Sequence, residues 1–499
     1  MKVTILTEGG RNTGYGHITR CISVYQAFEE RGIPSRLIVN GDETIEDLLK
    51  GKNYKIFNWL DDQQLLFEIL DNTNIVFIDS YLAEHEIYER ISEQVETAVY
   101  FDDDLRIDYP KGFVLNGAIF AEQLPYPPKK DITYLLGTRY TPLRKEFWDV
   151  AARPAHDNLK TIIVTFGGTD ICNLTPKVLE MLNDTYPKLL KKVTIGYGFE
   201  DTTKIEKLKN ANTELIYYPD ASGMKKVMLE SDIAISASGQ TLYELARIGV
   251  PTIAVCTADN QLNNIHSWEK TGFVEYAGWW EDKKITDVIP QKVELLKNKT
   301  LREKKHTIGN KYIDGKGSKR IVEELLYDFY KKQLVLREAT SADARNIFNL
   351  ANDDAVRKNS FNPGKIEWEH HLEWLREKLA NSNYSFFIVE CFGRFAGQVR
   401  FDRGSRPEKI LISISLDKRI RGLGLSSFII NKSIKKLLEI RKNVKLVEAH
   451  IKVENTPSIK SFEKAGFDFL KDTIVNGHNA CVYVREIGNF QHQRQVSWQ

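Results

Sequence analysis

The segment Gly14-Tyr15-Gly16-His17 places an imidazole in a glycine-containing turn between an apolar run at residues 3–6 and a helix-like segment that begins near Ile18. Glycines let the backbone approach a ligand closely, and the N-terminus of a helix attracts an anion. A histidine at this position can accept a proton near neutral pH. These residues favour a nucleotide-sugar site, and the alternative is a plain strand-to-helix turn with a surface histidine.

A second glycine-containing turn, Ser236-Ala237-Ser238-Gly239-Gln240-Thr241, follows another apolar run and opens a helix that carries Glu244. Small residues in such a turn expose backbone N–H groups to a pyrophosphate, and the helix dipole adds attraction. Glu244 can accept hydrogen bonds from ribose hydroxyls or remain a solvated or capping carboxylate. The glycine pair in Phe166-Gly167-Gly168-Thr169-Asp170 fits the same diphosphate, or else a plain turn.

The elements that must position these turns form two series in which short apolar runs alternate with helical segments. The first series has runs at residues 3–6, 35–39, 75–78 and 97–101, and the second, after a polar stretch at 151–160, has runs at 161–166, 192–195, 214–217, 233–236 and 252–255. This alternation predicts an α/β fold with two parallel sheets, in domains 1–150 and 151–332. We expect ligand groups to gather at the carboxyl ends of the strands, in the cleft between the two halves.

A third domain of the α+β type is predicted for residues 333–488. A helix at 319–332 ends the second domain, and a helix-rich opening from Leu334 precedes strands at 385–390, 397–401 and 410–416. A glycine-rich turn and a long helix at 426–438 follow. The polar residues 489–499 have no pattern, so we expect a flexible tail.

The composition limits the classes of partner. A chain of 499 residues needs several domains, and a net charge of +2 with 42% hydrophobic residues lacks the basic excess of a bulk nucleic-acid binder. The five cysteines are scattered without a CxxC pair, which predicts free thiols in a reducing compartment and no zinc site. No run approaches the roughly 20 apolar residues of a membrane span. We therefore expect a cytoplasmic protein that binds small molecules or proteins, with its oligomeric state left open.

Four segments occur in the same order as in a known family: Gly14-Tyr15-Gly16-His17 with Arg20-Cys21, Ile78-Asp79-Ser80-Tyr81, Ser238-Gly239-Gln240-Thr241-Leu242-Tyr243-Glu244, and Asp259-Asn260-Gln261. Together they resemble the UDP-2,4-diacetamido-2,4,6-trideoxy-β-L-altropyranose hydrolases of pseudaminic acid biosynthesis. The resemblance spans roughly residues 1 to 330. It implies two Rossmann-like lobes of the GT-B type, no metal, and inverting hydrolysis at the anomeric carbon that releases UDP and the free sugar.

The same resemblance implies roles for individual residues. His17 is the general base that takes a proton from the attacking water, while Tyr81 and Asn260 contact or orient the sugar and the water. The implied UDP-sugar-binding positions are Gly14, Gly16, Arg20, Gly167, Gly168, Ser238, Gly239, Gln240, Thr241, Glu244 and Gln261. Gln240 replaces the small residue often found in this turn, which leaves the phosphate contacts open.

Acidic residues offer competing assignments. Asp79, at the end of a buried-looking strand, is an alternative base, in which case His17 binds phosphate. The run Asp102-Asp103-Asp104 suggests a metal site, but consecutive acids rarely converge on one cation. We interpret this run as a solvated turn without a catalytic role, with a contact at the edge of the cleft as the alternative.

A second motif lies in the third domain. The sequence Arg419-Ile420-Arg421-Gly422-Leu423-Gly424, between a predicted strand and a predicted helix, resembles the acetyl-CoA pyrophosphate loop of the GNAT acetyltransferases. The segments Val453-Glu454-Asn455-Thr456-Pro457-Ser458 and Phe462–Phe467 resemble the second signature of that family. The resemblance implies acetyl-CoA as cosubstrate, with Asn455 on its pantetheine arm. The implied binding residues are Arg419, Arg421, Gly422, Leu423, Gly424, Asn455 and Ser458.

The proton carriers of this domain stay open. Phe462 stands where the family often has a tyrosine acid, so Tyr483, Ser458 or a water protonates the thiolate, or it leaves unassisted. Ser413 and Ser415 stand on the strand where the family often carries a glutamate, so the amine loses its proton through ordered water. The alternatives are His370 and His371, which we place on a helical surface.

The fusion of the two motifs suggests one substrate for both. In the pathway of the first resemblance, the hydrolase substrate arises when a GNAT domain acetylates UDP-4-amino-4,6-dideoxy-N-acetyl-altrosamine. We therefore predict a bifunctional enzyme whose partners are a UDP-sugar and acetyl-CoA, with no nucleic acid and no membrane. One alternative is a GT-B glycosyltransferase with an accessory acetyltransferase. The other is a non-catalytic nucleotide-sugar sensor with a degenerate GNAT module.

Overall fold

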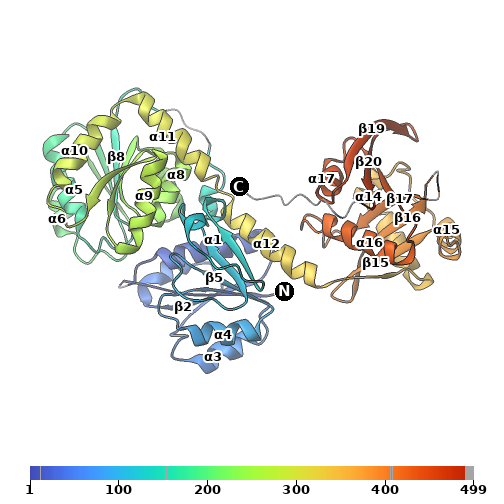
Figure 1. Ribbon diagram of the computed structural model, residues 1–499. Helices are drawn as coiled ribbons and strands as arrows, with labels where there is room; N and C mark the ends of the chain where they lie inside the picture. Colours follow the sequence, from blue (N-terminus) through green and yellow to red (C-terminus); the bar gives the residue numbers. More distant parts are fainter. Residues whose placement is uncertain (12, 152–154, 405, 407, 489–499) are drawn as a thin grey trace. The chain divides into compact units, whose positions relative to one another are not determined.

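The computed structural model describes residues 1–11, 13–151, 155–404, 406 and 408–488. The chain divides into two compact units, Met1–Val322 and Glu323–Gln499 (Figure 1). The expected tail at 489–499 lies outside the described residues. Within the part of the chain that is described, no helix is both long and apolar enough to cross a bilayer.

The first sheet of the Met1–Val322 unit has seven parallel strands in the order β3-β2-β1-β4-β5-β6-β7. Its strands are β1 (Val3–Gly9), β2 (Ser35–Gly41), β3 (Tyr54–Ile56), β4 (Ile75–Asp79), β5 (Thr97–Phe101), β6 (Gly112–Asn116) and β7 (Ile132–Leu136). The strand order reverses direction between β1 and β4. In open parallel sheets a ligand crevice forms at this switch point, beyond the carboxyl ends of the strands.

Helices cover both faces of this sheet. Leu66 of α3 (Gln63–Leu70) and Ile87 of α4 (His85–Gln94) pack into one apolar cluster with Ile78 of β4. On α1 (Gly16–Glu30), Phe28 packs edge-to-face against Phe77 with ring centroids 5.9 Å apart. A short helix, α2 (Glu46–Leu49), lies between β2 and β3. Helix α1 is the next element after β1, which is one of the two strands at the switch point.

The second sheet repeats this plan with six parallel strands in the order β10-β9-β8-β11-β12-β13. Its strands are β8 (Thr161–Thr165), β9 (Leu190–Ile195), β10 (Thr213–Tyr217), β11 (Ile233–Ala237), β12 (Thr252–Cys256) and β13 (Val274–Trp279). The helices of this region are α5 (Leu174–Thr185), α6 (Thr203–Lys207), α7 (Ala221–Leu229), α8 (Gln240–Ile248), α9 (Leu262–Thr271), α10 (Ile285–Leu296), α11 (Lys299–Tyr312) and α12 (Gly317–Lys332). The switch point here lies between β8 and β11.

Alternate side chains of each strand enter opposite cores. Ile162 and Val164 of β8 face α5, α6 and α10, while Ile163 faces α7, α8 and α9. Figure 1 shows α5, α6 and α10 on one side of the sheet and α8 and α9 on the other. A parallel sheet covered on both faces needs apolar residues at every position, which explains why these strands stood out as continuous apolar runs.

The sheet of the second unit has the order β14-β15-β16-β17-β18-β20-β19. Its strands are β14 (Leu334–Glu338), β15 (Ser385–Cys391), β16 (Arg394–Arg403), β17 (Lys409–Leu416), β18 (Leu446–Lys452), β19 (Asp468–Val475) and β20 (His478–Glu486), and its helices are α13 (Ala344–Ala351), α14 (Asp354–Asn359), α15 (Trp368–Ala380), α16 (Ser426–Ile440) and α17 (Thr456–Lys464). The domain opens on strand β14 before its helices, which corrects the predicted helix-rich start at Leu334. Helices α16 and α17 pack on one face, and α13 and α15 pack on the other.

The pair β17 and β18 is parallel and unusually short. Lys409–Leu411 pair with Leu446–Glu448, although β17 continues to Leu416 and β18 to Lys452. The two strands therefore separate toward their carboxyl ends and leave a wedge between them. Taken together, the three sheets confirm the predicted fold class of two Rossmann-like regions followed by an α+β domain.

Gly317 gives a test of the packing within the first unit. A Cβ atom added at Gly317 would lie 1.9 Å from the carbonyl oxygen of Thr141, a backbone atom that cannot rotate away. We expect Gly317→Ala to lower the free energy of unfolding of this unit by about 1–3 kcal/mol because the backbone must shift. Urea denaturation measures this. Gly364→Ala is the matched control, since no atom of the described residues lies within 4 Å of its added Cβ. Equal effects of the two substitutions would contradict this expectation.

Candidate functional site

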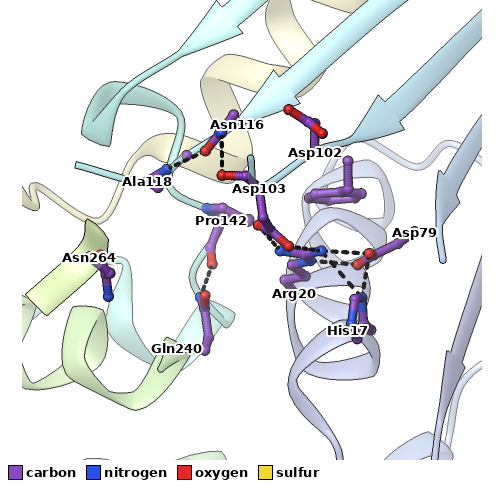
Figure 2. A network of polar contacts seen from close by, with 12 residues as sticks. His17, Arg20, Asp79, Asp102, Asp103, Asn116, Ala118, Pro142, Gln240 and Asn264 are labelled. Atoms are coloured by element: carbon purple, nitrogen blue, oxygen red, sulfur yellow. Dashed lines mark hydrogen bonds and ion pairs between the residues drawn. The ribbon is translucent and has the colours of Figure 1, made fainter. Parts of the chain in front are cut away.

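One buried carboxylate organises the carboxyl end of the first sheet (Figure 2). Asp79, the last residue of β4, has an Oδ1 atom 2.5 Å from Nδ1 of His17 and an Oδ2 atom 2.6 Å from Nε of Arg20. His17 and Arg20 lie one turn apart on α1, so both face the neighbouring strand β4. Arg20 also donates to Asp103, with Nη1 at 2.7 Å from Oδ1. Two acids and two bases are thus fixed at the switch point.

The charges of this network support one another. Burial by itself would raise the pKa of Asp79, but the Arg20 guanidinium and the His17 imidazole outweigh it and hold that pKa well below its usual range. For Asp103, the raising effect of burial is likewise outweighed by Arg20, which lowers the pKa. A carboxylate that holds its proton so weakly is a poor general base. This result disfavours Asp79 as the base and leaves it to orient His17.

Tyr81 is in contact with His17. Its ring packs edge-to-face on His17 with centroids 4.7 Å apart, and its hydroxyl donates to Asp103. The side chain of Asn260, in a short 3-10 segment Asp259–Gln261, lies beside the same hydroxyl. The buried carboxylate of Glu8 accepts hydrogen bonds from the Tyr81 backbone N–H and from the Ser80 hydroxyl. These two hydrogen bonds to Glu8 hold the loop that carries Tyr81 in place.

Two cavities meet at this place. The larger one, about 510 Å³, lies mainly against the second sheet, and the smaller one, about 190 Å³, holds His17. Four residues line both cavities: Gly16, Gly239, Gln240 and Gln261. A ligand with a large and a small part can therefore occupy both cavities, with these four residues beside the place where its two parts join.

The predicted residues distribute between the cavities. The three predicted catalytic residues and two binding residues line the small cavity alone: His17, Tyr81, Asn260, Arg20 and Ser238. Four binding residues line the large cavity alone: Gly167, Gly168, Thr241 and Glu244. Gly14 lines neither; it has φ of +77° and its backbone bridges to Gly10. The structure thus brings five segments of distant sequence, which follow β1, β4, β8, β11 and β12, into one region, with Gly14 as a turn residue outside both linings.

Side-chain contacts refine the roles in the second turn. Both carboxylate oxygens of Glu244 accept hydrogen bonds of 2.8 Å from Arg144, which the sequence analysis did not single out. The Gln240 amide donates to the Pro142 carbonyl at 2.9 Å, and the Ser238 hydroxyl donates to the Val255 carbonyl at 3.0 Å. Since these side chains already have partners, the turn offers a ligand mainly its backbone N–H groups at the start of α8.

The acidic run Asp102-Asp103-Asp104 is not a solvated turn, which corrects that interpretation. Asp102 is 2% exposed and accepts hydrogen bonds from Tyr109 and Tyr126, and Asp103 binds Arg20 and lines the small cavity. Asp104 is exposed. In the described ranges, no group of three His, Cys, Asp or Glu side chains is placed to hold a metal ion.

Residues missed from the sequence share one property: each gains its role through a distant partner. Arg144 lies 100 positions from Glu244, and Asp103 lies 83 positions from Arg20. Glu8 carried a usable signal, because it is the only charged residue of the first strand and a buried carboxylate is unusual.

The second unit contains a cavity of about 1170 Å³ between the wedge of β17 and β18 and helices α14 and α15. Four predicted acetyl-CoA residues line it: Arg421, Gly422, Asn455 and Ser458. Arg419, Leu423 and Gly424 do not; Arg419 instead binds Asp417 with Nε at 2.7 Å from Oδ1. The glycines Gly422 and Gly424 have φ of +74° and +71°, a backbone that glycine adopts readily.

The candidates for proton transfer differ in whether they line this cavity. Ser458 and Phe462 line it, whereas Tyr483 does not and donates its hydroxyl to Glu463 at 3.0 Å. Burial and that hydrogen bond raise the pKa of Tyr483 to about 12. His371 is 2% exposed, which corrects its expected place on a helical surface.

Two regions of the chain match known domain families. Residues 161–325 match the glycosyltransferase family 28 C-terminal domain, and residues 333–468 match the GNAT acetyltransferase domain. The chain joins a glycosyltransferase-like region to a GNAT domain. This finding confirms the predicted fusion.

Three relatives extend the comparison. An uncharacterized protein of Methanocaldococcus jannaschii is 22% identical over 97% of this chain and 99% of its own length. A Helicobacter pylori protein named pseudaminic acid cytidylyltransferase and UDP-2,4-diacetamido-2,4,6-trideoxy-beta-L-altropyranose hydrolase is 24% identical over 54% of this chain, which spans 47% of that relative. The spore coat polysaccharide biosynthesis protein SpsG of Bacillus subtilis is 23% identical over 67% of this chain and all of its own length. The chain is thus a homologue of a pseudaminic acid pathway protein.

Two of the solved structures that match this chain are acetyltransferases, and each covers about a third of it. A spermidine N-acetyltransferase from Vibrio cholerae in complex with CoA and spermine is 20% identical over 31% of this chain and 96% of its own, with a TM-score of 0.29. The aminoglycoside acetyltransferase AAC(6')-Ib in complex with coenzyme A is 17% identical over 31% of this chain and 94% of its own, with a TM-score of 0.28.

The Asp79 network predicts a pH-dependent stability. Because the folded-state pKa of Asp79 is lowered, its stabilising contribution is complete above the unfolded pKa of about 3.9 and is lost as the pH falls further. We expect Asp79→Asn to lower the free energy of unfolding by about 3 kcal/mol at pH 7 and by less at pH 3. Urea denaturation at both pH values measures the difference.

Asp104→Asn is the control for this experiment. Burial and the charges of Asp102 and Asp103 raise the pKa of Asp104, so its removal relieves repulsion and leaves stability unchanged or slightly higher at pH 7. A penalty for Asp79→Asn that is no larger than that of the control would contradict the role of the network.

Proposed function

We propose that this chain catalyses two consecutive reactions on a UDP-linked amino sugar. The GNAT domain transfers an acetyl group from acetyl-CoA to the 4-amino group of UDP-4-amino-4,6-dideoxy-N-acetyl-altrosamine. The two-sheet unit then hydrolyses the UDP-2,4-diacetamido-2,4,6-trideoxy sugar to UDP and free sugar, with inversion. The observation that carries the hydrolase step is the place of His17, which Asp79 holds in the small cavity beside the larger one.

The pair of cavities supports a nucleotide sugar as the ligand. The larger cavity contains the glycine pair Gly167-Gly168 and the start of α8, where backbone N–H groups and the helix dipole favour a diphosphate. The smaller cavity then takes the sugar and places its anomeric carbon near His17 and Tyr81. Glu244 remains a candidate for the ribose hydroxyls, because each of its oxygens keeps a second lone pair beside Arg144.

The chemistry follows from the orientation of His17. Nδ1–H donates to Asp79, so Nε2 is the nitrogen that can accept a proton from water. The water oxygen attacks the anomeric carbon while the bond to the diphosphate oxygen breaks. The charge that develops on UDP is stabilised by the N–H groups at residues 239–241. Tyr81 and Asn260 orient the water and the sugar.

The charge of the GNAT cavity supports an anionic cosubstrate and an anionic acceptor. Its lining contains five Lys or Arg residues and no Asp or Glu among the described residues: Arg357, Lys365, Arg400, Arg421 and Lys452. Arg421 and Gly422 belong to the loop that resembles the pyrophosphate loop, and they suit acetyl-CoA. The Nε atoms of Arg357 and Arg400 are buried and have no hydrogen-bond partner among the described residues, and these two guanidinium groups suit the phosphates of a nucleotide-linked amine.

A glycosyltransferase is the second candidate, since residues 161–325 match a glycosyltransferase family domain. It would need the same UDP-sugar site but a sugar acceptor in place of water. Incubation of the acetylated UDP-sugar with the protein alone separates the two, because only a hydrolase releases UDP without an added acceptor.

His17→Ala tests the hydrolase step. We expect the rate of UDP release to fall about 10²- to 10⁴-fold, because a positioned base contributes a factor of this size. Acetylation should continue at the wild-type rate, since His17 belongs to the other unit. NMR of the reaction mixture follows both products. His266→Ala, on α9 outside the lining of both cavities, is the control. Undiminished UDP release by His17→Ala would refute the assignment.

Arg400→Gln tests the acceptor. Loss of a charged hydrogen bond to phosphate should raise the KM for the UDP-linked amine about 10- to 100-fold, with the KM for acetyl-CoA unchanged. Steady-state assays of CoA release measure both constants. Lys435→Gln removes an exposed cation from α16 and should change neither. A rise confined to acetyl-CoA would place Arg400 on the cosubstrate instead.

A further inference from the structure

One face of the GNAT sheet carries a row of polar side chains that the sequence motifs do not include. In β18, Val447, Ala449 and Ile451 enter the apolar core. The alternate residues Glu448, His450 and Lys452 therefore lie on the opposite face. His450 and Lys452 line the large cavity of this unit, together with Ser413 and Ser415 of β17.

His450 lies where β17 and β18 separate. Leu411 and Glu448 form the last pair of the short ladder between these strands. Two residues further on, Ser413 and His450 are the next side chains on the cavity face of each strand. A group inserted into the wedge from its open end would meet His450 at the base of the wedge.

Glu448 fixes the orientation of His450. The Nε2 atom of His450 lies 2.6 Å from Oε1 of Glu448, and Oε2 of Glu448 lies 2.5 Å from Nζ of Lys409. Glu448 is 8% exposed; burial alone would raise its pKa, but Lys409 and His450 outweigh burial and lower it. An ionised Glu448 accepts the Nε2–H proton, which leaves the Nδ1 lone pair of His450 free to accept another.

Other candidates for this role are less suited. His371 donates its Nε2–H to the Ala344 carbonyl at 3.0 Å, and its ring is packed between Trp368 and Trp374. Burial lowers the pKa of His371. His370 lies on the same helix, without a carboxylate partner among the described contacts. The hydroxyls of Ser413 and Ser415 are too weakly basic.

We propose that His450 is the general base of the acetyl transfer and that Glu448 is its positioning residue. This inference rests on the acetyltransferase activity proposed above. The acceptor is a primary amine that enters from the side of α14 and α15, where Arg357 of α14 lies and where Arg400 of β16 packs over the ring of Trp374 on α15.

The proton and bond changes balance without a further reactant. Nδ1 of His450 takes one proton from the ammonium group of the acceptor. The amine nitrogen then bonds to the acetyl carbonyl carbon as the carbon–sulfur bond breaks, and the nitrogen loses its second proton to water. CoA leaves as the thiolate and takes a proton from water. His450 returns its proton to solvent.

The first test measures steady-state acetylation of UDP-4-amino-4,6-dideoxy-N-acetyl-altrosamine by the full chain. His450→Gln should lower kcat about 100-fold at pH 7, with the KM for acetyl-CoA unchanged. The difference in kcat between His450→Gln and the wild type should narrow as the pH rises toward the pKa of the acceptor amine, because more of the amine is then already deprotonated in solution. His478→Gln, on β20 outside the cavity lining, is the control and should match wild type.

The second test does not depend on turnover. Nitrogen NMR of the protein without substrate should show His450 protonated at Nε2, and Glu448→Gln should shift this to a mixture of the two tautomers. Added imidazole should restore part of the activity of His450→Ala, which a merely structural role would not allow. Wild-type kcat in His450→Gln would overturn the proposal while the acetyltransferase activity stands. Absence of acetylation by the wild-type chain would instead refute the proposed function itself.

Discussion

The ion pair between Asp79 and Arg20 is the interaction on which the first unit's site depends. Asp79 ends β4, and the parallel register places it beside Thr7 of β1, the strand that leads into α1. A buried carboxylate is costly without partners, so the fold must supply Arg20 and His17 to it. The same requirement fixes the rotation of α1 and, through Asp103 and Tyr81, the loops after β4 and β5.

The two units handle negative charge in different ways. In the first, the glycine turns at the switch points offer backbone N–H groups at helix N-termini, and the side chains Glu244, Gln240 and Ser238 are already bonded within the protein. In the second, arginine and lysine side chains supply the positive charge directly. Backbone donors suit a ligand held in one fixed pose, whereas long cationic side chains can follow a ligand whose position changes during a reaction.

How much the sequence predicts depends on burial and on the range of the contacts. The central strands β1, β4, β8 and β11 are buried on both faces, and their apolar runs were found. The edge strand β3 has three half-exposed or exposed residues and β19 is mostly exposed, so neither has such a run. Glycine turns and the GNAT loop were visible as local motifs. Asp103 and Arg144 were not, because their partners lie 83 and 100 positions away. His450 had a local signal, because apolar and polar residues alternate along β18, but it belongs to no glycine motif.

The early separation of β17 from β18 also determines which parts of the GNAT site can vary. Past Leu411 and Glu448, the facing edges of these strands carry main-chain N–H and C=O groups that an extended molecule can bind as an added strand would. Side-chain substitution leaves such groups in place. Recognition of an extended ligand along the wedge is therefore resistant to side-chain mutation, while the polar side chains on the cavity face are free to change.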